Sequence, residues 1–176
     1  TGQNDGATVT LDCYAPLISK DASASYDERH DWGVKKTVDP TYQDGFYPGD
    51  KPSWTWTIDV TETVKDQNFS VTGNIKVANP VGSPGNMIVA LSDVLNDTTV
   101  ATVDCGSGAT SVTVAPGTIK SCSYSASPSD ASATENKATG TFNSINFVAT
   151  APVSFVKNVV NGTAKLSDDE IGLLNK

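Results

Sequence analysis

Histidine, methionine and charged side chains are scarce in this chain of 176 residues. The sequence has one His and one Met, and charged residues make up 18% of it. It also lacks a G-x-S-x-G, an H-E-x-x-H and a phosphate-binding glycine loop, so the residue sets of common catalytic sites are missing. We therefore expect that the protein is not an enzyme and needs no cofactor.

Long apolar runs are missing as well. No window approaches the roughly 18 apolar residues that a membrane-spanning helix needs. The net charge is −8, and an acidic chain is repelled by the phosphates of nucleic acid and by anionic lipid surfaces. We expect no nucleic-acid partner and no membrane span. No basic-then-apolar leader begins at Thr1, so a secreted form would have lost its signal already.

Alternation of apolar and polar residues is the main positive signal. It is clean in residues 54–60, 69–77 and 87–91, as expected of strands that bury one face. Turn residues separate such runs at intervals typical of a sandwich, and we predict an all-β fold of about eight to ten strands. The one helix candidate is residues 166–174, with Ser167 as its N-cap, and the alternative is that this segment is a tail.

Six short segments carry a family resemblance. They are residues 18–26, 32–40, 69–80, 102–106, 114–117 and 122–125. Together they resemble the immunoglobulin-like (Ig-like) repeat domains of unknown function in large secreted and surface proteins of bacteria and archaea. The resemblance implies an antiparallel β-sandwich with a structural or adhesive role, and it transfers no catalytic residue.

The resemblance covers roughly residues 16–156 and sets the expected domain boundaries. We expect an Ig-like β-sandwich over residues 15–158 with extended tails at residues 1–14 and 159–176. The resembled domains usually occur in long multidomain chains, whereas a single module with two tails suggests a polymer subunit.

The first tail contains a candidate donor strand, namely Ala7, Thr8, Val9, Thr10 and Leu11. An alternating segment can add as a strand to the open sheet edge of another copy. Repeating that head-to-tail contact gives an open filament. The alternative is a strand that pairs within its own domain. A second candidate donor consists of Thr163, Ala164, Lys165 and Leu166.

These observations lead to an expected function. We expect an extracellular structural protein of the cell surface, a subunit of a pilus-like or other filament assembled by donor-strand complementation. Its partners would be copies of itself, as a homopolymer. The alternative is an adhesin or S-layer-type module that binds glycan or protein. Asn68, Asn96 and Asn161 begin glycosylation sequons, whose use depends on the source cell.

The three cysteines predict one disulfide. Cys105 and Cys122 are 17 residues apart on neighbouring expected strands, and such a pair in a secreted sandwich favours a bond. Two buried free thiols are the alternative. Cys13 is left over as a buried free thiol, as a link to another chain, or as a replacement for one partner of the pair.

Tryptophan and histidine are assigned to structural positions. Trp32, Trp54 and Trp56 are expected in the core rather than on a sugar-binding platform, because Trp54 and Trp56 share a strand face. His30 is expected to be half-buried or on a strand surface, since no nucleophile elbow or helix N-terminus accompanies it.

Two further possibilities involve acidic and lysine side chains. Carboxylates cluster in residues 27–31 and 168–170 but lack the alternating ligands and glycine of a calcium loop, so we expect no metal. Lys35 and Lys36 near Asn residues raise the idea of a Lys–Asn isopeptide bond, but nothing in the sequence marks the buried acid that this bond requires.

Overall fold

A computed structural model of the chain describes residues 11–168 and 172–174, which form twelve strands and no helix. The chain divides into two compact units. Unit 1 consists of Thr1–Ser25 and Phe69–Val156, and unit 2 consists of Tyr26–Asn68 and Lys157–Lys176. In the described part of the chain, no helix has the length and apolar character needed to cross a bilayer.

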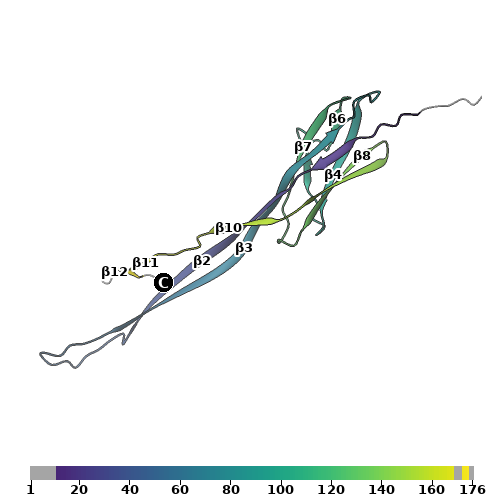
Figure 1. The fold of residues 1–176 in the computed structure, drawn as a ribbon. Coiled ribbons are helices and arrows are strands. Elements are labelled where there is room, and N and C mark those ends of the chain that lie inside the picture. The colour runs from purple at the N-terminus through teal and green to yellow at the C-terminus, as the bar shows by residue number, and fades with distance from the viewer. Residues whose placement is uncertain (1–10, 169–171, 175–176) are drawn as a thin grey trace, which may run out of the picture. The chain divides into compact units, whose positions relative to one another are not determined.

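Unit 1 contains two packed antiparallel sheets (Figure 1). The first has the order β1 (Leu17–Lys20), the C-terminal part of β3 (Thr55–Ala78), β7 (Ile119–Ala126) and β5 (Thr102–Asp104). The second has the order β6 (Ser111–Val114), β4 (Met87–Leu95), β8 (Glu135–Phe142) and β9 (Ile145–Pro152). The predicted all-β sandwich is confirmed, and the arrangement is compatible with an Ig-like fold.

The core of unit 1 lies between these sheets. Strand β4 shows why the sequence folds in this way, because Met87, Val89 and Leu91 point inward while Ile88 points to solvent. Fully burying one such side chain stabilises the fold by about 1.5–3 kcal/mol. The fully buried apolar residues include Val71, Ile75, Val77, Val89, Val114 and Ala138.

Unit 2 is a β-ribbon. Strand β2 (Ser23–Asp39) lies between β3 and β10 (Phe155–Val160) in the sheet order. None of the described residues of unit 2 is buried, since a few strands without a second layer cannot enclose a core. Trp54 and Trp56 are 47% and 58% exposed and Trp32 is half-buried, so the expectation that the tryptophans lie in the core is wrong.

Near the C-terminus, β11 (Leu166–Asp168) and β12 (Gly172–Leu174) form a small antiparallel hairpin. Of the two alternatives for residues 166–174, the helix is therefore wrong for the residues that the structure describes. A segment this short gains little from helix formation without packing, and pairing Leu166 with Leu174 satisfies backbone groups instead.

The division into units differs from the expected sandwich over residues 15–158. Residues 26–68 belong to unit 2, and residues 157–158 do too. The expected C-terminal tail includes the end of β10 and the hairpin of β11 and β12. Alternation in the sequence shows which residues share a face, but not whether a second sheet covers that face.

Candidate functional site

The N-terminal segment is exposed over residues 11–15, whereas Pro16 is buried next to the start of β1. Residues 11–16 form no strand, and Leu11 is 81% exposed. Figure 1 shows this purple segment leading away from the sandwich of unit 1. Of the candidate donor strand, Ala7, Thr8, Val9 and Thr10 lie outside the described residues.

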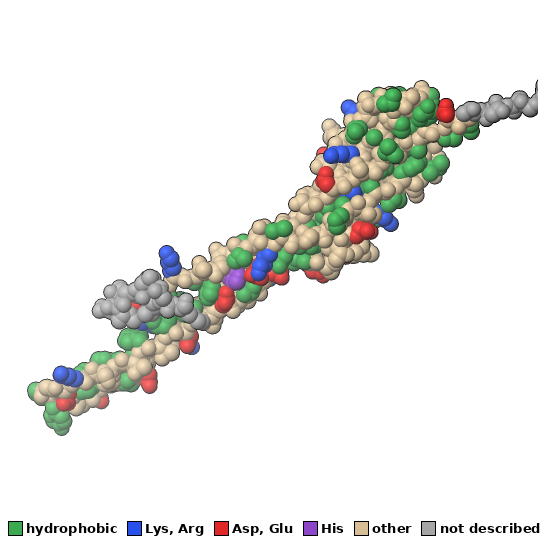
Figure 2. Space-filling model, viewed as in Figure 1, with side chains coloured by type: hydrophobic (Ala, Val, Ile, Leu, Met, Phe, Trp, Pro, Cys, Tyr) green, Lys and Arg blue, Asp and Glu red, His purple; other side chains and the backbone are tan. Residues whose placement is uncertain are grey.

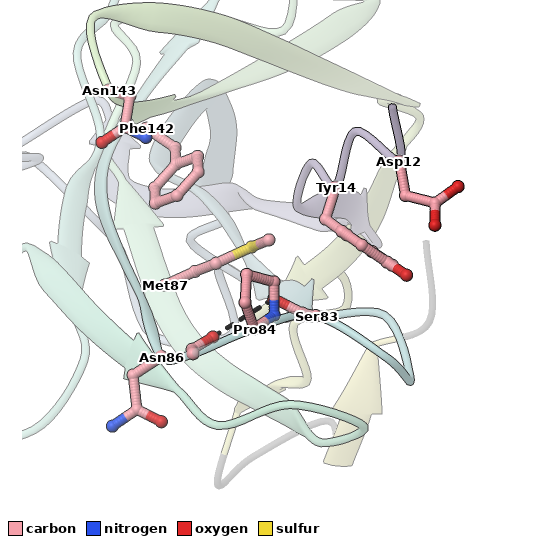
Figure 3. A pocket seen from close by; sticks show the side chains of 9 residues that line it. Asp12, Tyr14, Ser83, Pro84, Asn86, Met87, Phe142 and Asn143 are labelled. Carbon is pink, nitrogen blue, oxygen red and sulfur yellow. Dashed lines mark hydrogen bonds between the residues drawn. The ribbon is translucent and has the colours of Figure 1, made fainter. Parts of the chain in front are cut away.

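A hollow of about 380 Å³ lies where this segment meets the sandwich (Figure 3). Its apolar lining includes the buried Met87 and the half-buried Phe142, and Tyr14 of the N-terminal segment faces them. Asp12 and Asn143 add polar groups to the lining. The hollow can receive an apolar side chain, but it does not hold a nucleophile beside a base.

The edges of the sandwich differ in length. Strand β9 has eight residues and pairs with β8 on one side, whereas the edge strands β5 and β6 have three and four residues. Ile145 and Val148 of β9 are 60% and 55% exposed. Very short edge strands limit unwanted pairing, whereas a long apolar edge invites it. Strand β9 is therefore the longest edge strand in the described part of unit 1, since β1 also has four residues. Strand β1 of the other sheet contacts β9.

Unit 2 exposes aromatic side chains along the connection between β2 and β3 and at the start of β3. They are Tyr42, Phe46, Tyr47, Trp54 and Trp56. In Figure 2, hydrophobic side chains reach the surface at this end of unit 2. The Nζ of Lys36 lies 4.7 Å from the centroid of the Trp56 ring, and it also pairs with Asp168. Exposed aromatics with a cation are typical of interaction surfaces.

His30 is half-buried, as expected, and lies in a charged cluster of unit 2. Its Nδ1 is 2.6 Å from Oε1 of Glu62, and its Nε2 is 3.3 Å from Oε1 of Glu28. The hydrogen bond with Glu62 is the main cause that raises the pKa of His30 above its ordinary value. Lys157 donates to both carboxylate oxygens of Glu28, which lowers the pKa of Glu28 and raises that of Lys157. The cluster is an ion-pair network.

Of the carboxylates considered for calcium, Asp169 and Glu170 lie outside the described residues, and the others are engaged separately. Asp27 accepts from the amide of Asn68, Asp31 accepts from Arg29, and Asp168 pairs with Lys36. Among the described residues, no three His, Cys, Asp or Glu side chains gather as metal ligands.

The predicted disulfide is present. Cys122 on β7 is fully buried and is bonded to Cys105, which follows β5 and is half-buried. The bond thus fixes the short edge strand β5 to its neighbour. Cys13 is a free thiol but it is exposed, so the alternative of a buried thiol is wrong.

The sequon asparagines differ in their surroundings. The side-chain amide of Asn68 donates to Asp27 at 2.8 Å, and that of Asn96 donates to Thr134 at 2.9 Å. Asn161 is exposed, and its backbone carbonyl accepts a hydrogen bond from the Trp32 indole. Asn161 is therefore the sequon with the side chain most open to modification.

The second candidate donor strand is partly paired already. Thr163, Ala164 and Lys165 are exposed and form no strand, but Leu166 begins β11 and pairs with Leu174 of the same chain. This segment would have to open its own hairpin in order to donate all four residues.

The sequence reasoning missed a buried polar cluster in unit 1, formed by Lys20, Asp93, Tyr124 and Asn136. Lys20 and Asp93 form an ion pair of 2.6 Å with both side chains fully buried. Burial lowers the pKa of Lys20, opposed by the hydrogen bond to Asp93. Burial also raises the pKa of Tyr124 to about 12. The sequence feature that could have indicated this cluster is a polar residue on the inward face of a strand. Lys20, for example, lies two residues after Ile18 and shares its face.

Lys35 and Lys36, the lysines considered for an isopeptide bond, are both exposed on β2. The buried lysine of the described chain is Lys20 instead.

Comparisons with models of protein families, with curated proteins and with solved structures gave no match to this chain.

Proposed function

We propose that this chain is an extracellular structural module whose copies assemble by strand addition. In this proposal residues 7–11 of one copy pair with the outer edge of β9 of another. The observation that carries it is the eight-residue β9 edge, which exposes Ile145 and Val148 beside an unpaired row of backbone groups.

Two further observations support the proposal. Residues 11–15 are exposed and form no strand, with Leu11 in solvent. A row of added backbone hydrogen bonds, each contributing about 0.5–1.5 kcal/mol net, together with burial of Ile145 and Val148, would give a specific but modest contact. The disulfide between Cys105 and Cys122 suits an oxidising, extracellular environment.

The test is assembly of the purified chain, followed by sedimentation velocity and negative-stain images. We expect rods that lengthen with protein concentration. The double substitution Val9→Asp and Leu11→Asp should abolish them, because it places charge on the apolar face of the donor. Thr8→Asp with Thr10→Asp is the matched control, since it adds the same charge on the other face. Isolated globules at every concentration, or equal loss in the control, would refute the proposal.

The exposed aromatics of unit 2 favour a second candidate function, an adhesive surface for glycan or protein. Aromatic rings stack on sugar faces and anchor protein interfaces. A glycan array that compares the unaltered chain with Trp54→Ala and Trp56→Ala tests this candidate. Binding that both variants lose supports it, and binding that is absent or unchanged argues against it.

A further inference from the structure

The ion pair between Lys20 and Asp93 lies entirely inside unit 1. Its Nζ–Oδ2 distance is 2.6 Å, and both side chains have zero exposure. Taking two charges out of water costs several kcal/mol per ion, and their attraction often fails to exceed that cost. Stability alone is therefore a weak reason for this pair to be buried.

Asn136 makes the site more unusual. Its side chain is fully buried, and neither its amide nitrogen nor its oxygen makes a hydrogen bond of good geometry within the described residues, although an interaction with the Tyr124 hydroxyl opposes the rise in the pKa of Tyr124. The Oδ1 of Asp93 likewise has no hydrogen-bond partner there. Leaving a buried polar group unpaired costs about 1–3 kcal/mol. Such groups side by side suggest a chemical role rather than a packing role.

The sheet register brings these groups together. Asp93 is opposite Ala138 and Leu95 is opposite Asn136, so Asp93 and Asn136 are diagonal neighbours on the inward face of β4 and β8. Diagonal neighbours are within reach of long side chains. Lys20 enters from β1 in the opposite sheet.

Tyr124 forms one side of the same space. The Nζ of Lys20 lies 4.2 Å from the centroid of its ring, and its hydroxyl donates to the Asp21 carbonyl at 2.6 Å. Gly73 permits this close approach, because a Cβ there would collide with Tyr124 and the Asp21 carbonyl. The ring holds the lysine in a water-poor site with few alternative positions.

We propose that Lys20 and Asn136 become joined by an isopeptide bond that the folded chain forms by itself, with Asp93 as the acid and base. The bond would tie β1 of one sheet to β8 of the other. This inference is independent of the proposed assembly, because the three residues belong to one copy of unit 1.

The reaction balances without a co-reactant. Lys20 passes a proton to Asp93 and becomes a neutral amine, whose lone pair forms a bond to Cγ of Asn136. Asp93 protonates the Asn136 nitrogen, and the Cγ–Nδ2 bond breaks with its electron pair leaving on ammonia. The nitrogen of Lys20 then gives up one further proton and becomes a neutral amide. This proton either leaves with ammonia as ammonium or stays on Asp93. One C–N bond forms and one breaks, and nothing is oxidised or reduced.

The environment favours this step. Burial disfavours the charged amine, which is the direction of the Lys20 pKa shift. Holding the reacting groups together removes the entropy cost of their encounter. Asn136 is the better acceptor than Asp93. If Lys20 condensed directly with Asp93, no other described side chain of the cluster would offer an equally well-placed carboxyl group to transfer the protons.

The test is the intact mass of the unaltered, full chain after denaturation, reduction and thiol alkylation. We expect a mass lower than the sequence mass by one ammonia, and a branched peptide that contains Lys20 and Asn136 after proteolysis. An unshifted mass overturns the proposal. Loss of one water with Lys20 linked to Asp93 overturns the choice of acceptor.

Variants then assign the roles. Lys20→Arg, Asn136→Ala and Asp93→Asn should each retain the full mass, and Lys36→Arg, which alters an exposed lysine, should still lose ammonia. An ammonia loss that persists in Lys20→Arg overturns the proposal. The mass of the unaltered chain remains decisive even if a core variant fails to fold.

Discussion

Cys122, fully buried on β7, is bonded to Cys105 at the end of the edge strand β5. The bond closes a loop with a sequence separation of 17 residues. In the chain-entropy model a loop of this size stabilises the fold by about 3 kcal/mol. We therefore predict that reduction, or Cys105→Ala with Cys122→Ala, lowers the free energy of unfolding in urea by that amount. Cys13→Ser is the control and should change little, and a loss below about 1 kcal/mol in the double variant would contradict the prediction.

His30 gives a prediction on pH. Its pKa is raised in the folded chain, first by Glu62, so its contribution to stability is fully present below the unfolded pKa. That contribution is lost as the pH rises through the higher, folded pKa. Because the chain has one histidine, an NMR titration should report a single pKa above 6.5, the ordinary value. Glu62→Gln should move it down. A value at or below 6.5 in the unaltered chain would be evidence against the network.

Core and ribbon side chains should respond differently to truncation. Ile75 is fully buried in unit 1, and Ile75→Ala should cost about 2–5 kcal/mol in unfolding free energy. Trp56 is 58% exposed, and Trp56→Ala removes mainly its contact with Lys36, which contributes about 0.5–1 kcal/mol at an exposed site. Urea unfolding of both variants measures the difference. Equal losses would show that the Trp56 ring is covered.

The sequence predicts unit 1 well for a simple reason. In residues 87–91 every second side chain is apolar, and the second sheet covers that face. The same period of two in residues 54–60 predicts that Trp54 and Trp56 are buried, whereas both are exposed. Periodicity identifies a shared face, whereas burial depends on a second layer that unit 2 lacks.

The buried polar cluster could not be predicted from the sequence, for a different reason. Lys20, Asp93 and Asn136 come from three strands far apart in the chain, and their meeting depends on sheet pairing and register. In a strand sequence, a polar residue ordinarily indicates a position that faces solvent, so the sequence does not by itself show that Lys20, Asp93 and Asn136 point inward. Nearness in the sequence to Asn residues favours Lys35 and Lys36 instead, although both are exposed.

Strand addition at β9 is tested most directly by trapping a disulfide between two copies. Cys13 is an exposed thiol two residues beyond Leu11, about 7 Å along an extended chain. One copy keeps Cys13, and the other carries Cys13→Ser with either Ile145→Cys or Val148→Cys. A disulfide requires Cα atoms within roughly 7 Å. The account predicts that at least one β9 variant yields far more cross-linked dimer under mild oxidation than a control copy with Thr102→Cys on β5. Yields at β9 no higher than at β5 would contradict it.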